Sequence, residues 1–129
     1  MGRTFLLVGS ILGFLTVALG AFGAHALKQS IPADSLAVFQ TGVQYQGLHA
    51  LALLAVGTLL YVLPQPGKLK TVGWLFTAGV VIFSGSLYAL AITDKKWLGA
   101  ITPLGGLCFL IGWGLLIWSA ASLREYSNS

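Results

Sequence analysis

Four stretches of the chain contain no Asp, Glu, Lys or Arg and are long enough to cross a membrane as helices. They cover residues 4–24, 43–63, 71–92 and 99–122. A hydrocarbon core ~30 Å thick takes about 20 helical residues. Backbone amides in lipid form hydrogen bonds within their own segment, and barrel strands would be shorter and would alternate apolar with polar residues. The pattern predicts an all-α integral membrane four-helix bundle, in which residues 1–129 form a single transmembrane domain.

The first connection, residues 25–42, is the only one long enough to carry structure of its own. Pro32 suits the first turn of a helix, Asp34 is favourable near a helix N-terminus, and apolar residues follow at helical spacing. We therefore expect a short helix between spans one and two. It would either lie at the membrane interface or run into the second span, with Gly42 as the expected bend between them.

The two later connections are short. The second contains Pro64, Pro66 and Gly67, which predict a tight turn. The third places Trp97 at the depth of the membrane interface, where indole rings anchor helices. Pro103 suits either a kink in the fourth span or its beginning.

Composition agrees with a membrane protein. Hydrophobic residues make up 57% of the chain and charged residues 8%, whereas soluble domains average about 25% charged residues. The net charge of +4 does not indicate nucleic-acid binding, because the seven basic residues stand singly or in pairs at the ends of apolar runs. The single cysteine, Cys108, lies in an apolar span, where a small buried packing role is its default.

The placement of basic residues gives an orientation. The end that carries both termini has Arg3, Lys68, Lys70 and Arg124, and the other end has Lys28, Lys95 and Lys96. Because cytoplasmic loops carry an excess of Lys and Arg, this difference favours cytoplasmic termini. We expect a multi-pass membrane protein with its termini in the cytoplasm.

Uncharged polar side chains gather in the half of the bundle next to the first and third connections. At about 100° per residue, Thr41, Tyr45 and His49 share one face of the second span, which would leave polar groups unpaired if it faced lipid. We expect this face to form one wall of an internal polar pocket near a single membrane surface. The candidate ligand-binding residues are His25, Gln44, Tyr45, Gln46, His49, Ser86, Tyr88 and Thr102.

Small residues form stripes on two of the spans. One stripe contains Gly9, Gly13, Thr16, Gly20 and Gly23, and the other contains Gly105, Cys108, Gly112 and Ser119. In lipid, close backbone contact takes the place of hydrophobic burial in holding helices together. We expect both stripes to be helix contact surfaces.

Four sequence words carry a family resemblance. They are GAFGAHALK (20–28), QTGVQYQGLHALALL (40–54), FSGSLYALAIT (83–93) and LGAITPLGGLCFLIGW (98–113). They closely resemble a family of small four-helix bacterial inner-membrane proteins typified by YgdD and YwdK, domain-of-unknown-function family 423. The resemblance implies a four-helix fold that spans the bacterial inner (plasma) membrane, and it brings no catalytic residue with it. Two departures are Gly47-Leu48, where a bulkier residue is frequent, and Asp94, where glycine is common.

The polar residues support three functional hypotheses. The leading one is a non-enzymatic membrane protein whose pocket binds a lipid headgroup, a small ligand or a partner helix, the last from a homo-oligomer or another membrane protein. The second is a protomer of an oligomeric channel or transporter, although coupled transporters normally carry charged residues within their spans. The third is a carrier of haem, with His25 and His49 as ligands, or of a quinone, with Gln44, Gln46 and Tyr88 at its headgroup. The two histidines lack the other ligands of a metal set, and a hydrogen bond from each to a neighbouring helix or a lipid headgroup is the favoured explanation, so we predict no cofactor and no metal.

Overall fold

The computed structural model describes residues 1–63 and 67–123. Pro64 and Pro66 of the predicted turn, and Arg124 of the charge comparison, lie outside the described residues. The helical elements, in chain order, are α1 (Gly2–His25), η1 (Leu27–Gln29), α2 (Ala33–Val62), α3 (Leu69–Gly79), η2 (Val80–Ser84), α4 (Gly85–Thr93), η3 (Lys96–Ala100) and α5 (Thr102–Ala121). The elements α3, η2 and α4 follow one another without a break and form one long helix.

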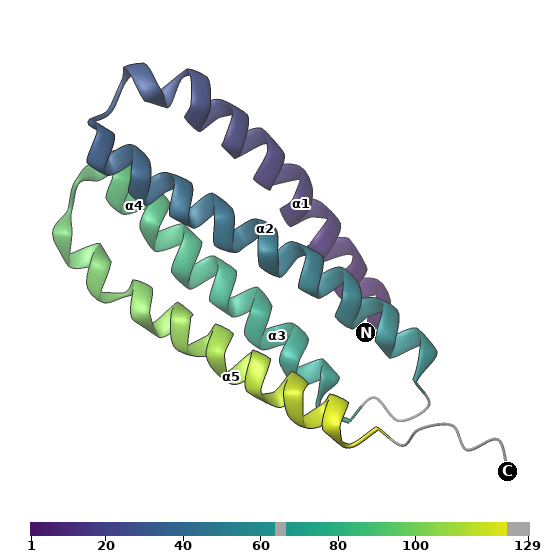
Figure 1. Ribbon diagram of the computed structural model, residues 1–129. Coiled ribbons are helices and arrows are strands. Elements are labelled where there is room, and N and C mark those ends of the chain that lie inside the picture. Colours follow the sequence, from purple (N-terminus) through teal and green to yellow (C-terminus); the bar gives the residue numbers. More distant parts are fainter. Residues whose placement is uncertain (64–66, 124–129) are drawn as a thin grey trace, which may run out of the picture.

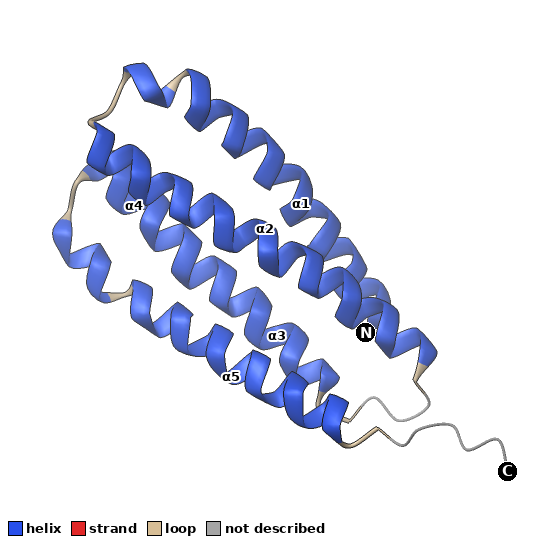
Figure 2. Cartoon of the chain, in the orientation of Figure 1, coloured by secondary structure: helices blue, strands red, loops and turns tan. Residues whose placement is uncertain are grey.

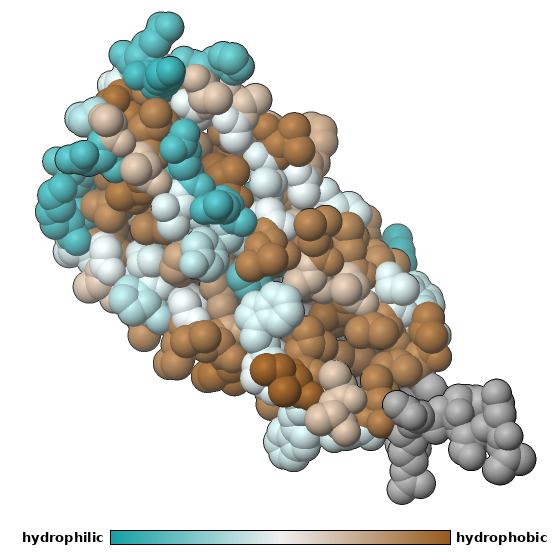
Figure 3. Space-filling view, in the orientation of Figure 1, coloured by the Kyte–Doolittle hydropathy of each residue, from teal (hydrophilic) through white to brown (hydrophobic). Residues whose placement is uncertain are grey.

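The predicted fold class is confirmed. Four long helices run up and down in a bundle, and the described part of the chain contains no strand (Figures 1 and 2). Each of the four is long and apolar enough to cross a membrane. In Figure 3, hydrophilic residues gather at the end of the bundle near the first and third connections, and hydrophobic residues cover much of the flank below.

The helix predicted in the first connection is the N-terminal part of α2 and runs into the second span. Pro32 precedes the helix in an extended conformation, and Asp34 lies in its first turn. Gly42 does not interrupt α2. A Cβ atom at Gly42 would lie 2.7 Å from Cε1 of Tyr88, so glycine here permits a close approach of α4 instead of a bend.

The third connection contains Trp97 and leads to Pro103. Trp97 lies in η3 with its side chain exposed, and Pro103 lies in the first turn of α5, so it begins this helix and does not kink it. Asp94 ends α4 with a φ of 56°, in the left-handed region. Glycine adopts that conformation most easily and aspartate tolerates it, which explains how Asp94 can stand where glycine is common.

The third long helix contains a π-helical segment, η2, which the sequence did not predict. The segment lies against the N-terminal half of α5, where a Cβ atom at Gly105 would collide with the backbone nitrogen of Phe83. Short π segments inside α-helices are rare and are frequent at functional sites. Here the segment lies at a close contact between α5 and the third helix.

Packing follows the order α1, α2, third helix, α5 (Figure 1). The principal contacts join α1 to α2, α2 to the third helix, and the third helix to α5. A buried cluster that includes Phe5, Leu53, Val56, Phe76 and Phe109 fills the interior. The two outer helices therefore keep large apolar surfaces exposed, as membrane-spanning helices do.

The two small-residue stripes are helix contacts at most positions. Gly9 lies against the carbonyl of Ala50, Gly23 against the ring of Phe39, and Gly112 against the ring of Phe76. Gly13 is an exception, because nothing lies within 4 Å of the position of its Cβ.

Candidate functional site

His49 lies near the middle of α2 and is 1% exposed. Its Nδ1 lies 2.7 Å from the carbonyl oxygen of Tyr45, and its Nε2 lies 3.0 Å from the indole Nε1 of Trp113 on α5. A carbonyl oxygen only accepts and an indole N–H only donates. His49 is therefore a neutral imidazole that carries its proton on Nδ1 and accepts from Trp113 at Nε2.

Aromatic rings surround this imidazole. The ring of Phe109 stacks on it with centroids 3.6 Å apart and planes 10° apart, and the ring of Phe76 meets it edge-on at 5.1 Å. Phe109 and Trp113 come from α5, and Phe76 comes from α3. His49 thus joins three of the four long helices through one hydrogen bond and two ring contacts.

This geometry bears directly on the histidine-ligand hypothesis. An axial haem ligand uses a ring-nitrogen lone pair, and the only lone pair of the neutral His49 ring accepts from Trp113. His25 is exposed at the C-terminal end of α1, away from this aromatic cluster. In the part of the chain that the structure describes, no three His, Cys, Asp or Glu residues are grouped to hold a metal ion.

A second buried polar group joins α1, α2 and α4. The amide nitrogen of Gln46 donates to the carbonyl oxygen of Leu12 at 3.0 Å, and the hydroxyl of Tyr88 donates to Oε1 of Gln46 at 2.6 Å. Gln46 is buried, and Tyr88 is half-buried. The two side chains satisfy each other and a backbone carbonyl, so they form an interhelical contact.

Hydroxyl groups make two further contacts between helices. Ser86 on α4 and Thr102 on α5 share a hydrogen bond of 2.6 Å, and Ser86 also lies 2.9 Å from the carbonyl oxygen of Phe83. Ser84 donates to the carbonyl oxygen of Gly42 at 2.7 Å. Ser84 is not among the eight candidate residues named from the sequence.

The eight candidate residues therefore do not line one polar cavity. Gln46 pairs with Tyr88, Ser86 pairs with Thr102, and His49 pairs with Trp113. The side chains of His25, Gln44 and Tyr45 are exposed. Binding of a ligand by these residues stays a prediction, because the polar groups at the helix contacts bind one another.

Sequence analysis missed Trp113 and Phe109. Both lie in an apolar run of α5, where an aromatic residue is ordinarily core packing. One signal was present: a buried indole N–H usually finds a hydrogen-bond partner. The sequence does not say which residue that partner is.

A groove of about 440 Å³ lies between α2 and α5 beside this aromatic cluster. Its lining is mainly apolar and aromatic and comprises Tyr45, Leu48, His49, Phe83, Pro103, Gly106, Leu107, Phe109, Leu110 and Trp113. Leu48, Leu107 and Leu110 are exposed at its rim, and Leu110 is 71% exposed. The groove therefore opens on the flank of the bundle that apolar side chains cover.

The Gln46–Tyr88 contact can be tested by removing one hydroxyl. We expect Tyr88→Phe to lower the free energy of unfolding by about 0.6 kcal/mol, and by no more than about 1.7 kcal/mol, the range for interhelical hydrogen bonds in membranes. Unfolding of the purified protein in mixed detergent measures the change. Tyr61→Phe is the matched control, because Tyr61 is exposed at the C-terminal end of α2. Equal losses for the two variants would contradict a stabilising Gln46–Tyr88 bond.

Comparison with known proteins identifies the family. The family described as "Protein of unknown function (DUF423)" matches residues 19–106. The UPF0382 membrane protein YwdK of Bacillus subtilis is 49% identical over 118 residues, which cover 92% of this chain and 96% of that protein. The UPF0382 inner membrane protein YgdD of Escherichia coli is 37% identical over 129 residues, with 95% of this chain and 93% of that protein covered. No solved structure matches the chain. The resemblance is confirmed, and the chain belongs to the DUF423 family of integral membrane proteins.

Proposed function

We propose that this protein is a non-enzymatic component of the bacterial inner membrane that binds the acyl chain of a membrane lipid in the groove between α2 and α5. Its termini would face the cytoplasm, as the placement of basic residues favours. This proposal replaces a polar pocket with an apolar groove as the binding element, because the polar side chains at the helix contacts are bonded to one another.

The observation that carries the proposal is the shape and chemistry of the groove. Ligand sites are concave and mainly apolar, with few polar groups, and this groove of about 440 Å³ fits that description. Gly106 and Pro103 of α5 line the groove, and Gly106 has no side chain to fill it. Exposed leucines border the opening. Lipid chains are the apolar molecules that surround a membrane-spanning helix, so they reach the opening directly.

The hydroxyl groups near the groove support a non-enzymatic function. A nucleophilic serine needs a base within hydrogen-bond reach. Ser84 donates to a backbone carbonyl, and Ser86 bonds a backbone carbonyl and Thr102. His49, the buried base of this region, is bonded to Tyr45 and Trp113.

Photochemical labelling tests acyl-chain binding. The full chain is reconstituted with a phospholipid that carries a diazirine on its acyl chain, and mass spectrometry maps the labelled residues after irradiation. We expect labelling to concentrate on groove residues such as Leu107 and Phe83. Gly106→Leu should reduce this labelling about tenfold, because its Cβ would lie 3.9 Å from the ring of Phe83, in ordinary contact, and the rest of the side chain would fill the groove.

The matched control is Gly114→Leu, the same substitution on the same helix. Nothing lies within 4 Å of the Cβ position of Gly114, which does not line the groove. This variant should leave labelling of the groove unchanged. Uniform labelling of all exposed residues would refute the proposal. Crosslinks from groove residues to a second protein chain would also refute it and would assign the groove to a partner helix.

A further inference from the structure

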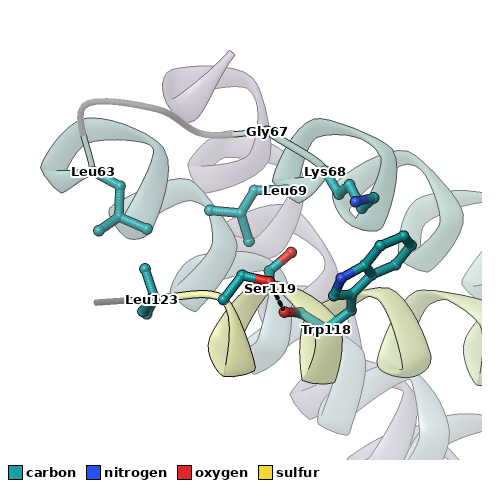
Figure 4. A pocket seen from close by; sticks show the side chains of 8 residues that line it. Leu63, Gly67, Lys68, Leu69, Trp118, Ser119 and Leu123 are labelled. Carbon is teal, nitrogen blue, oxygen red and sulfur yellow. Dashed lines mark hydrogen bonds between the residues drawn. The ribbon is translucent and has the colours of Figure 1, made fainter. Parts of the chain in front are cut away.

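A second cavity lies at the end of the bundle where α1 begins and α5 ends. It has a volume of about 240 Å³ and is bordered by the end of α2, the beginning of α3 and the end of α5. Its lining residues are Leu63, Gly67, Lys68, Leu69, Trp118, Ser119, Ser122 and Leu123 (Figure 4). The lining therefore combines one cation and two serine hydroxyl groups with several leucines. The groove between α2 and α5 contains neither a lysine nor a serine.

Lys68 brings a positive charge to this cavity. Its Nζ lies 3.3 Å from the centre of the indole ring of Trp118, which holds the ammonium group beside the cavity (Figure 4). Among the described residues, the one ion pair joins Lys96 to Asp94, at the other end of the bundle. Lys68 is also the N-cap residue of α3. The partial positive charge of a helix N-terminus therefore adds to that of the ammonium group.

Ser119 supplies an independent indication of a ligand. Its Oγ is inaccessible to solvent and has no hydrogen-bond partner in the described part of the chain. The neighbouring Ser122, by contrast, donates to the carbonyl oxygen of Trp118 at 2.8 Å. A buried hydroxyl without a partner costs free energy. An acceptor oxygen inside the cavity would remove that cost.

We propose that this cavity binds the phosphate group of an anionic phospholipid. The ammonium group of Lys68, the N-terminal end of α3 and the hydroxyl of Ser119 all favour an anion with several acceptor oxygens. Leu63, Leu69 and Leu123 border the same cavity and suit the glycerol and upper acyl carbons of a lipid. Free phosphate would leave these apolar walls without a partner.

The charge distribution agrees with this assignment. Among the described residues, the end of the bundle that holds the cavity carries three basic residues, Arg3, Lys68 and Lys70, and no acidic residue. The opposite end carries three basic residues and two acidic ones, Asp34 and Asp94. Basic residues beside a membrane span attract anionic lipids. The site is separate from the groove between α2 and α5, and either could fail its test without the other.

Native mass spectrometry of the purified full chain in detergent measures binding at this site. Phosphatidylglycerol, phosphatidylcholine and inorganic phosphate are added in parallel series. We expect tighter binding of phosphatidylglycerol than of the other two. Lys68→Gln should weaken it about tenfold, the effect of losing one charge-assisted hydrogen bond. Lys70→Gln is the matched control, since Lys70 is exposed two residues later on α3 and does not line the cavity. It should leave the affinity unchanged.

Ser119→Ala gives a second test that does not depend on charge. It should weaken phosphatidylglycerol binding about threefold. It should not lower the thermal unfolding temperature of the lipid-free protein, because Oγ of Ser119 makes no described hydrogen bond and an unpartnered buried hydroxyl costs free energy. Equal losses for Lys68→Gln and Lys70→Gln, or none for Lys68→Gln, would overturn the site. Inorganic phosphate that binds as tightly as phosphatidylglycerol, with the same dependence on Lys68, would overturn the lipid assignment.

Discussion

Replacing Gly105 with alanine is expected to lower the free energy of unfolding by about 3 kcal/mol, the upper part of the range for overpacking. The added methyl group would collide with the backbone nitrogen of Phe83 in η2. A backbone atom inside a helix cannot turn aside as a side chain can, so α5 would have to move away from the third helix. That movement would also loosen the stacking of Phe109 on His49.

Unfolding of the purified variant in mixed detergent, followed by circular dichroism, measures this effect. Gly114→Ala is the matched control, because its Cβ would enter open space on the same helix. The control should be as stable as the unmodified chain or slightly more stable, since alanine favours helix over glycine. Equal stability of the two variants would show that the contact between α5 and η2 does not limit the packing of the bundle.

His49→Ala is expected to lower the free energy of unfolding by about 3 kcal/mol, within the range for removing a large buried ring. The substitution leaves a cavity beside Phe76 and Phe109. It also leaves the indole N–H of Trp113 without its acceptor. The loss should therefore exceed that of a hydrogen bond alone, which averages about 0.6 kcal/mol between membrane helices.

The same unfolding measurement separates these two contributions. Leu51→Ala on α2 is the control for loss of side-chain volume, because Leu51 is 68% exposed, and it should change stability little. Trp113→Phe removes the donor and keeps an aromatic ring. A double-mutant cycle between positions 49 and 113 then isolates the bond. A loss for His49→Ala no larger than that for Leu51→Ala would rule out the aromatic cluster as a stabilising element.

The helices could be predicted from the sequence because lipid leaves the backbone few choices. An apolar run of about 20 residues without charges has to be helical if it spans a membrane. Local signals also worked at helix beginnings, since Pro32 precedes α2 and Pro103 lies in the first turn of α5. These inferences need only the residues of one segment.

The partners of the polar side chains could not be predicted, because they depend on how neighbouring helices are rotated and shifted along their axes. Depth and helical face placed Gln46 and His49 in the same half of the bundle. In the structure, Gln46 bonds α1 and α4, whereas His49 bonds α5. Depth alone does not distinguish these arrangements, which is why one shared pocket was expected.

The π segment η2 is a further reason why the partners of the polar side chains could not be predicted from the sequence. A π turn adds about one residue to the helical repeat, so the residues that follow it face a direction about 100° from the one that regular spacing predicts. Ser86 and Tyr88 both follow η2. No glycine or proline pattern in residues 80–84 signals this change.

The order in which the long helices pack has a consequence for biosynthesis. Each long helix makes its principal contacts with the one next to it in the chain, and such local topology favours rapid assembly. An N-terminal segment emerging from the ribosome can dock on its immediate successor before the last span has been made. The helices are thus expected to pack in neighbouring pairs as they are inserted. The contact of His49 with Phe109 and Trp113 of α5 should form last.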